Sequence, residues 1–306
     1  MTGTVLVVGE TGQLAVALAE ALPAHGLAAQ RAGRPALDFD RPDSIATAFH
    51  AAAPSLVVNA AAYTAVDAAE DDAETAFRAN RDGPAQLAAL CEAAAIPLIH
   101  ISTDYVFDGN KRSPYVETDP TAPQGVYGAS KLAGEQAVMA ACSRAIIMRT
   151  SWVYSPTGKN FVRTMLAVGQ RNPQMRVVAD QRGCPTSAPD LAVAIAGIAA
   201  RIAEHGWQDR YAGIYHAAGS GETTWHGLAI ATFEAAARHG QAAPEVEGIS
   251  TDQWPTKARR PPDSRLDCAR LEAVFGLRLP HWRDGVERTV DAIFAAARSA
   301  ERDRAA

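Results

Sequence analysis

The sequence has few cysteines and no cluster of metal-ligating side chains. Its four cysteines are widely spaced without a CxxC pair, and its eight histidines are scattered. Disulfide frameworks and zinc sites need paired or clustered ligands, so neither is predicted. We expect a protein of a reducing compartment, and therefore a cytoplasmic one.

The chain also lacks a long apolar run and a strong excess of one charge. Its most apolar segment, 191–200, is too short to span a bilayer and predicts a buried helix. The first residues lack the basic and apolar regions of a signal peptide. With a net charge of −5 spread over both signs, the chain has no basic field to attract nucleic acid. We expect neither a membrane nor a nucleic-acid partner.

Short apolar segments alternate with Ala-rich and Leu-rich helical segments in the first half. The expected strands are 4–9, 27–31, 55–60, 97–102 and 145–150, and the expected helices lie near 13–23, 43–53, 66–79, 82–95 and 128–142. Continuous apolar strands between helices indicate a parallel sheet covered on both faces. We therefore predict an α/β fold, a Rossmann-type doubly wound parallel sheet.

The alternation loosens after residue 150, where turns and Pro-rich loops become frequent. Helices are expected near 161–171 and 189–204, and strands at 175–180 and 213–219. We predict a dinucleotide-binding domain at 1–150 and, at 151–306, mainly a smaller α+β substrate lobe. Segment 213–219 is a candidate to rejoin the first sheet.

A glycine-rich turn, 9-GETGQLA-15, joins the first strand to the first helix. In this context Gly9 and Gly12 let the backbone approach a dinucleotide pyrophosphate at a helix N-terminus, and Ala15 is small enough for close packing. Ordinary strand-to-helix turns share the pattern, so both interpretations stay open. The candidate cofactor contacts of the turn are Gly9, Thr11, Gly12, Gln13 and Leu14.

The end of the second strand indicates which dinucleotide is used. An acidic residue there would bind the ribose of NAD, but this chain has Arg31 and Arg34, which suit the 2′-phosphate of NADP. NADPH is therefore favoured, with NADH as an alternative. The competing interpretation is that both arginines are solvated surface charges.

Tyr127 and Lys131 form a YxxxK pair in 127-YGASKLAGE-135. At positions i and i+4 of a helix the two side chains share one face, so the ammonium would favour the ionised phenol. Together with a cationic, oxidised nicotinamide, this lysine would lower the pKa of Tyr127 and let it exchange a proton with a carbinol oxygen near neutrality. Such pairs also occur on exposed helices without a function. The position of this one, between the fourth and fifth strands, favours the catalytic interpretation.

These motifs together resemble the extended short-chain dehydrogenase/reductase superfamily. Within it the chain is similar, along nearly its whole length, to the dTDP-4-dehydrorhamnose reductase family. The segments that carry the likeness are 9-GETGQLA-15, 59-NAAAYTAVDAAE-70, 101-ISTDYVFDG-109, 127-YGASKLAGE-135, 149-RTSWVY-154, 185-PTSAPDLA-192, 215-YHAAGSGETTW-225 and 259-RRPPDSRL-266. The glycine-rich turn and YxxxK identify the superfamily only, whereas STDYVFDG, RTSWVY and RRPPDS indicate the narrower family.

The resemblance implies reduction of the 4-keto group of dTDP-4-dehydro-6-deoxy-L-mannose to dTDP-L-rhamnose, with NADPH or NADH as hydride donor. It implies that Thr103 hydrogen-bonds the substrate carbonyl, that Tyr127 donates the proton, and that Lys131 holds the nicotinamide ribose. No metal is implied, because the cofactor supplies the hydride and the protein positions it.

The resemblance implies further contacts, each with a structural alternative. Cofactor contacts are expected at Asp38, Phe39, Ala60, Ala61 and Ala62. Substrate contacts are expected at Val66, Thr103, Asp104, Tyr105, Trp152 and Arg260. Asp38 is equally well a helix-start carboxylate, the alanines can simply pack, and Asn80 can be structural. The basic group Lys257, Arg259, Arg260 and Arg265 is either a diphosphate clamp or a solvated loop.

Several alternatives stay open on function and assembly. The first rival is a reductase or epimerase of another nucleotide sugar, and the second is a non-catalytic NADP-binding regulatory subunit. Some family members form metal-bridged dimers through glutamates, but Ala17 and Pro189 stand at those places here. We expect a monomer or a homodimer without a bridging metal.

Overall fold

A six-stranded parallel sheet forms the centre of the computed structural model, which describes residues 3–305. Its strand order is β10-β5-β4-β3-β1-β2. The strands are β1 (Thr4–Val8), β2 (Ala28–Ala32), β3 (Leu56–Asn59), β4 (Leu98–Thr103), β5 (Ala145–Thr150) and β10 (Gly213–His216). The strands predicted in the first half are confirmed, and β10 lies parallel to β5, so its segment does rejoin the sheet.

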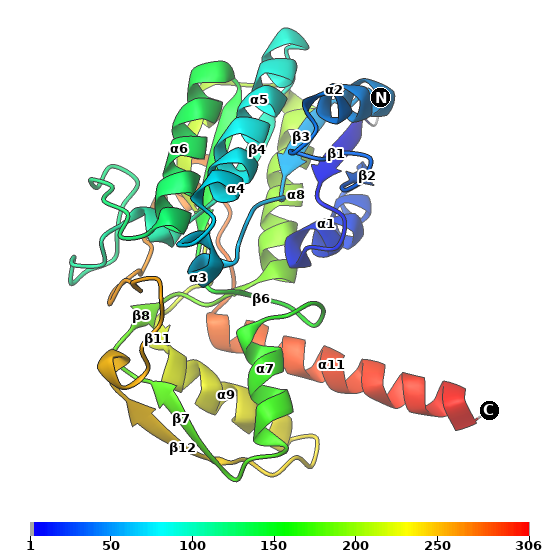
Figure 1. Cartoon of the computed structure of the whole chain (residues 1–306). Coiled ribbons are helices and arrows are strands. Elements are labelled where there is room, and N and C mark those ends of the chain that lie inside the picture. Colours follow the sequence, from blue (N-terminus) through cyan, green and yellow to red (C-terminus); the bar gives the residue numbers. More distant parts are fainter. Residues whose placement is uncertain (1–2, 306) are drawn as a thin grey trace.

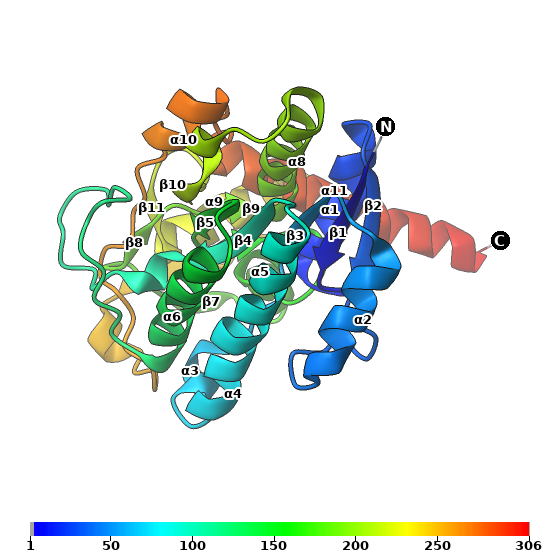
Figure 2. The ribbon, with the colours of Figure 1, turned by 90° about the horizontal axis from the view of Figure 1, so that it is seen from above.

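Helices cover both faces of this sheet (Figure 2). On one face lie α1 (Gln13–Ala24) and α8 (Ala188–His205), whose apolar sides form one buried core with the strands. On the other lie α2 (Pro42–Ala52), α5 (Gly83–Ala93) and α6 (Val126–Ala141), around a second core. The doubly wound Rossmann-type architecture is confirmed, and segment 191–200 is a helix with a buried side, as predicted.

The helix predicted at 66–79 is interrupted once, at residues 70–72. Its first part is α3 (Val66–Ala69); its second part, α4 (Ala73–Phe77), continues through a π-helical turn, η1 (Arg78–Asp82), directly into α5. The side chain of Asp72 accepts a hydrogen bond from Thr75 N at 3.3 Å, which starts a new helix where the prediction had a continuous one. The break aims Asn80 inward, where it donates to Tyr63 O and to Ser130 Oγ and so ties the loop after β3 to α6.

A smaller lobe lies beyond the carboxyl ends of the strands (Figure 1). Its apolar core joins α7 (Phe161–Gly169), α9 (Trp225–Ala237) and the first part of α11 (Trp282–Ala305). Its short strands are β6 (Val153–Tyr154), β7 (Gln174–Val178), β8 (Arg182–Gly183), β9 (Thr186–Ser187), β11 (Thr223–Thr224) and β12 (Glu245–Ile249), and η4 (Thr251–Gln253) is a 3-10 turn. Helix α10 (Ala269–Phe275) and the 3-10 turn η3 (Asp209–Tyr211) pack in the core of the main sheet, and the 3-10 turn η2 (Asp104–Val106) directly follows β4. The division at residue 150 stays a prediction, because α8 and β10 pack with the first half.

Within residues 3–305, none of the helices combines the length and the apolar character that crossing a membrane requires.

A buried ion pair ties α6 to the sheet. Arg149 on β5 donates from Nε to Glu135 Oε1 at 2.9 Å and from Nη2 to Oε2 at 2.7 Å, and each side chain is only 2% exposed. Ser102 on β4 donates to the same Oε1 at 2.5 Å. One carboxylate on α6 therefore joins two neighbouring strands near the end at which both stop.

Replacing Arg149 with Met should lower the free energy of unfolding by about 3–5 kcal/mol, because the Glu135 carboxylate would be left buried and unpaired. Urea unfolding followed by circular dichroism measures this change. The matched control is Arg176→Met, since the Arg176–Glu247 pair is exposed and should contribute less than about 1 kcal/mol. Equal effects of the two substitutions would contradict the importance of the buried pair.

Candidate active site

The candidate residues gather where the parallel strands end. Gly9 follows β1, Ala60 follows β3, and Thr103 is the last residue of β4. Thr103 lies opposite Thr150 of β5 in the sheet register. Thr150 in turn precedes Trp152 by two residues. Ligands of open α/β sheets bind in the crevice at this edge, so the topology alone brings these segments to one place.

The glycine-rich turn has the geometry of a pyrophosphate site. Gly9 has a φ of 130°, and a side chain on it would press against Ala15 and the backbone of Ala60. Gly12 stands at the N-cap of α1 with open space around its Cα, and its helix start has no side-chain cap among the described residues. The first amides of α1 are therefore available to an anion.

The other predicted residues of the turn differ in their surroundings. Thr11 is exposed, whereas the Leu14 side chain packs into the core and leaves only its backbone for a ligand. Gln13 reaches the opposite lobe: its Nε2 donates to Val153 O at 3.5 Å, and its Oε1 accepts from Asn160 Nδ2 at 2.9 Å. Gln13 thus links the turn to the chain just after β5.

At the end of β2, Arg31 lies against the glycine-rich turn. Its Nη1 donates to Glu10 O at 2.7 Å, while Arg34 is exposed. Asp38 accepts from Asp40 N at 3.1 Å and pairs with Arg41 at 3.7 Å, contacts that fit the local, helix-start interpretation. The cofactor roles of Arg31 and Asp38 stay predictions.

The predicted small residues after β3 line the same side of the turn. Ala60 N donates to Val8 O at 3.0 Å, and Ala61 N donates to Asn59 Oδ1 at 3.2 Å. Ala62 is exposed, and Phe39 packs against Gly83 at the start of α5. This arrangement leaves the space beside Gly9 to small side chains.

Thr103, Tyr127 and Lys131 come together between β4 and α6. Lys131 is buried, and its Nζ donates to Ile101 O of β4 at 2.6 Å. Thr103 Oγ1 donates to Asp104 Oδ1 at 3.0 Å. The first turn of α6 is fixed in turn by Glu70, whose Oε1 accepts from Val126 N at 2.8 Å. The predicted catalytic residues are thus neighbours, and the structure leaves their roles as predictions.

Burial sets the protonation of this group. It raises the pKa of Tyr127 above its ordinary value, with the Thr103 hydroxyl opposing the shift. It lowers the pKa of Lys131 to about 8, with the Glu135 carboxylate opposing it. In the protein alone desolvation dominates the pKa of Tyr127, and the Lys131 ammonium donates to Ile101 O; the expected lowering by Lys131 together with an oxidised nicotinamide stays a prediction.

The predicted substrate residues form the wall beside Tyr127. The rings of Tyr105 and Tyr127 meet edge to face, with centroids 5.5 Å apart. Arg260 donates from Nη1 to the Tyr105 hydroxyl at 3.1 Å and from Nη2 to Asp67 Oδ2 at 2.5 Å. Asp67 follows the half-buried Val66 at the start of α3. Arg260 therefore faces the candidate site through Tyr105.

Asp104 directly precedes Tyr105 in the chain. Its side chain is buried, and burial raises the pKa of its carboxyl to about 6, with hydrogen bonds from Ser264 and Thr103 opposing the shift. One of its oxygens, Oδ2, is buried without a hydrogen-bond partner among the described residues. Asp104 is therefore placed to orient Thr103, and direct contact with a substrate stays a prediction.

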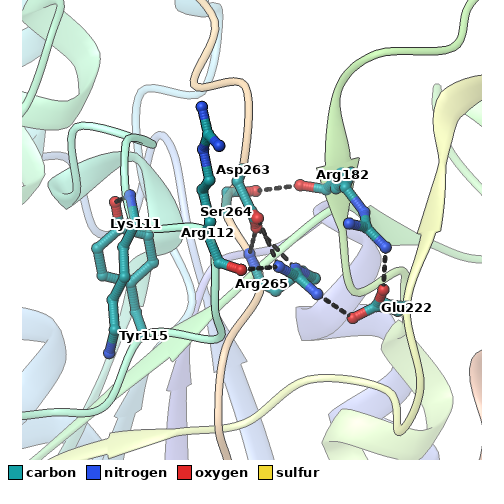
Figure 3. Close-up of polar contacts among 8 residues, drawn as sticks. All are labelled: Lys111, Arg112, Tyr115, Arg182, Glu222, Asp263, Ser264 and Arg265. Atoms are coloured by element: carbon teal, nitrogen blue, oxygen red, sulfur yellow. Dashed lines mark hydrogen bonds and ion pairs between the residues drawn. The ribbon is translucent and has the colours of Figure 1, made fainter.

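The predicted basic group does not act together. Arg265 is buried and makes two hydrogen bonds to Asp263, at 2.8 and 2.6 Å, an ion pair with Glu222, and a bond to Arg112 O at 3.0 Å (Figure 3). Lys257 pairs with Asp71, whereas Arg259 is exposed. For Arg265 both expected interpretations are wrong: it is neither a solvated side chain nor free to clamp a diphosphate, because its donors are used inside the protein.

Sequence reasoning missed Glu135, Arg149 and Asp67. Glu135 did carry a signal, since it follows Lys131 by four residues and Tyr127 by eight and so lies on the same face of α6. Arg149 lies in an apolar strand, and Asp67 meets Arg260 across 193 positions. Neither of these pairings leaves a local pattern in the sequence.

Across residues 3–305, no group of three or more His, Cys, Asp or Glu side chains is placed to hold a metal ion.

Comparison with known proteins gives the family. The model of the family described as the RmlD substrate binding domain matches residues 3–294. A dTDP-4-dehydrorhamnose reductase from Sinorhizobium fredii is 46% identical over 288 residues, which are 94% of this chain and 96% of that protein. This chain belongs to the dTDP-4-dehydrorhamnose reductase family.

Solved members of the dTDP-4-dehydrorhamnose reductase family share the fold. The crystal structure of the Bacillus anthracis enzyme in complex with NADP has a TM-score of 0.86 at 32% identity, covering 94% of this chain and 99% of that one. A Streptomyces antibioticus relative named "Probable dTDP-4,6-dihydroxy-2-methyloxan-3-one 4-ketoreductase" is 38% identical over 95% of this chain and 96% of its own length. The family resemblance predicted from the sequence is confirmed.

Substituting Lys131 with Met should change how stability depends on pH. Because the pKa of Lys131 is lowered from 10.5 to about 8, the unfolded chain binds more protons than the folded one between these values. Wild-type stability should therefore gain on the order of 1–3 kcal/mol from this group as pH rises through that window. Urea unfolding of both proteins from pH 7 to 10.5 tests this, and parallel stability curves would contradict it.

Proposed function

We propose that this chain is an oxidoreductase that uses NADPH to reduce the 4-keto group of dTDP-4-dehydro-6-deoxy-L-mannose, giving dTDP-L-rhamnose for cell-surface polysaccharide. The observation that carries the proposal is the meeting of Thr103, Tyr127 and Lys131 at the sheet edge where the open N-terminus of α1 also lies. The names of the relatives supply the substrate and the direction of the reaction.

The residues of the glycine-rich turn fit a bound dinucleotide. Gly9 needs its positive φ and has no room for a side chain, and the space at Gly12 leaves the first amides of α1 open to a pyrophosphate. Arg31 lies beside this turn and suits the 2′-phosphate of NADPH. When bound, the nicotinamide supplies the hydride.

The remaining chemistry belongs to side chains of this protein. The Thr103 hydroxyl and the Tyr127 phenol would hydrogen-bond the carbonyl oxygen on which negative charge develops. Tyr127 would then give that oxygen its proton. The raised pKa of Tyr127 suits reduction, because the phenol keeps its proton until a stronger base forms beside it. Lys131, with a pKa of about 8, is charged at neutral pH and would hold the ribose.

We assign the dinucleotide mainly to residues 1–150 and the sugar mainly to residues 151–306. Val66, Asp104, Tyr105, Trp152 and Arg260 would contact the sugar, with Arg260 supported by its bonds to Tyr105 and Asp67. We also propose a cytoplasmic location, which is supported by four free cysteines, three of them buried.

A reductase of another nucleotide 4-ketosugar is the second candidate function. The Streptomyces antibioticus relative, named as a 4-ketoreductase of a different sugar, favours it at 38% identity. An epimerase or a regulatory subunit has weaker support: the Thermus thermophilus UDP-glucose 4-epimerase structure is only 24% identical and supports the fold alone. An epimerase would regenerate its cofactor, and a regulatory subunit would not oxidise it.

With dTDP-4-dehydro-L-rhamnose as substrate, wild-type protein should oxidise NADPH, followed by its absorbance, and Tyr127→Phe should lower kcat by about 10²–10⁴-fold. The reason is that the variant keeps the ring but has no proton to donate. Tyr211→Phe is the matched control, since Tyr211 is buried in the core below the sheet and should leave kcat unchanged. Wild-type protein that binds NADPH without oxidising it would contradict the proposal and favour another ketosugar or the regulatory subunit.

Arg31→Met should raise the KM for NADPH about tenfold and leave the KM for NADH nearly unchanged, because only NADPH offers a phosphate to the guanidinium. Steady-state rates with each cofactor at saturating sugar measure this ratio. Arg34→Met, made in parallel, shows whether the second exposed arginine shares the role. An equal loss with both cofactors from Arg31→Met would show that Arg31 only supports the turn through Glu10 O.

A further inference from the structure

Trp152 has a strained backbone at the junction between the sheet and the smaller lobe. It follows β5 by two residues and has a φ of 48°, a left-handed conformation that is an outlier for a bulky side chain. Such residues cost on the order of 1–3 kcal/mol and persist where the surroundings fix them, most often at functional sites. The next residue, Val153, accepts a hydrogen bond from Gln13 of the glycine-rich turn.

One face of the Trp152 indole is covered by Trp225. The two rings are parallel, with an interplanar angle of 7° and centroids 3.6 Å apart. Trp225 is held in place, because its Nε1 donates to Gln181 Oε1 at 3.1 Å and Gln181 donates on to Thr251 Oγ1 at 3.0 Å. Trp225 is therefore held firmly against one face of the Trp152 indole.

The opposite face is covered by the backbone at Gly183. A methyl group on Gly183 would meet three adjacent indole atoms of Trp152, Cε2 at 2.5 Å, Cζ2 at 2.7 Å and Nε1 at 2.8 Å. Cε2 is the nearest of the three, so the added carbon would sit over the ring and not beside its edge. The 3.6 Å spacing to Trp225 leaves no room between the rings, so Gly183 lies on the other side.

Trp225 and Gly183, the two residues that cover the faces of the indole, belong to one small structural unit. Gly183 is on β8, which pairs antiparallel with β11 so that Gly183 lies opposite Thr223 and Arg182 opposite Thr224. Trp225 is the residue directly after β11 and the first residue of α9. The pairing of β8 with β11 therefore sets the spacing between Gly183 and Trp225, and the large sheet does not take part in this pairing.

The clamped indole keeps one polar group available. Within residues 3–305 the Trp152 Nε1 makes no hydrogen bond to the protein, and the residue is partly exposed, so this N–H can donate to a ligand. We propose that Trp225 and Gly183 are positioning residues that clamp the Trp152 indole and fix its free edge against the nucleotide sugar. This inference rests on the proposed function.

The experiment compares Trp225→Ala, Trp225→Phe and Gly183→Ala with wild-type protein. Removing the Trp225 ring, or crowding the indole with a methyl group at Gly183, should raise the KM for dTDP-4-dehydro-L-rhamnose about three- to tenfold. Trp225→Phe keeps an aromatic face and should bring the KM most of the way back to the wild-type value. The Kd for NADPH, measured by fluorescence, should stay within about twofold in all three, because the clamp does not include the turn. Trp225→Ala should also remove the near-ultraviolet circular dichroism of the stacked indoles.

The matched control is Gly197→Ala in α8, where an added methyl group would lie at least 3.4 Å from its nearest neighbour, Leu277. It should change neither KM nor the circular dichroism. Loss of the stacked-indole signal with an unchanged sugar KM in Trp225→Ala and Gly183→Ala would overturn the inference while leaving the proposed function standing. Wild-type protein without turnover would instead overturn the proposed function, and this inference with it.

Discussion

The buried Glu135–Arg149 ion pair is the constraint on which the arrangement of the site depends. Removing both charges from water costs several kcal/mol, which the bidentate geometry and the Ser102 hydroxyl only partly offset. Arg149 Nη1 is even left without a partner among the described residues. We infer that the pair contributes register more than stability: α6 cannot slide along β4 and β5 without separating a buried charge pair, and α6 carries both Tyr127 and Lys131.

The same burial explains the electrostatics of the site. It keeps the Tyr127 phenol protonated, lowers the pKa of Lys131 to about 8 and raises that of Asp104 to about 6. Glu135 opposes the shift at Lys131, so the residue that fixes the helix also helps to keep the ammonium charged. Burial therefore keeps the phenol protonated, whereas the lysine is charged at neutral pH in spite of burial; the proposed reduction would need both groups in these states.

The sequence predicts the parts of this structure that depend on neighbours along the chain. Continuous apolar strands, the turn at Gly9 and the YxxxK spacing are all local patterns, and each is found where it was predicted. The prediction of one continuous helix at 66–79 was wrong, because Asp72 caps a new helix there and this capping bond outweighs a weak helical preference. The prediction for Arg265 was wrong for another reason, because only the fold brings its partners Glu222 and Arg112 close to it. The catalytic and binding roles of the individual residues stay predictions.

Contacts within the protein connect Tyr127 to Trp152 in a continuous series. Tyr127 meets Tyr105, whose hydroxyl is bound by Arg260. The segment after Arg260 pairs with β8 through the backbone of Arg182, which donates to Pro262 O at 2.9 Å. Arg182 O also accepts from Ser264 N at 2.9 Å (Figure 3). The residue after Arg182 is Gly183, which lies against Trp152. The position of the Trp152 indole relative to the Tyr127 phenol is therefore determined by the fold itself. If a sugar binds between them, as proposed, it meets side chains that folding has already ordered, so binding loses less conformational entropy.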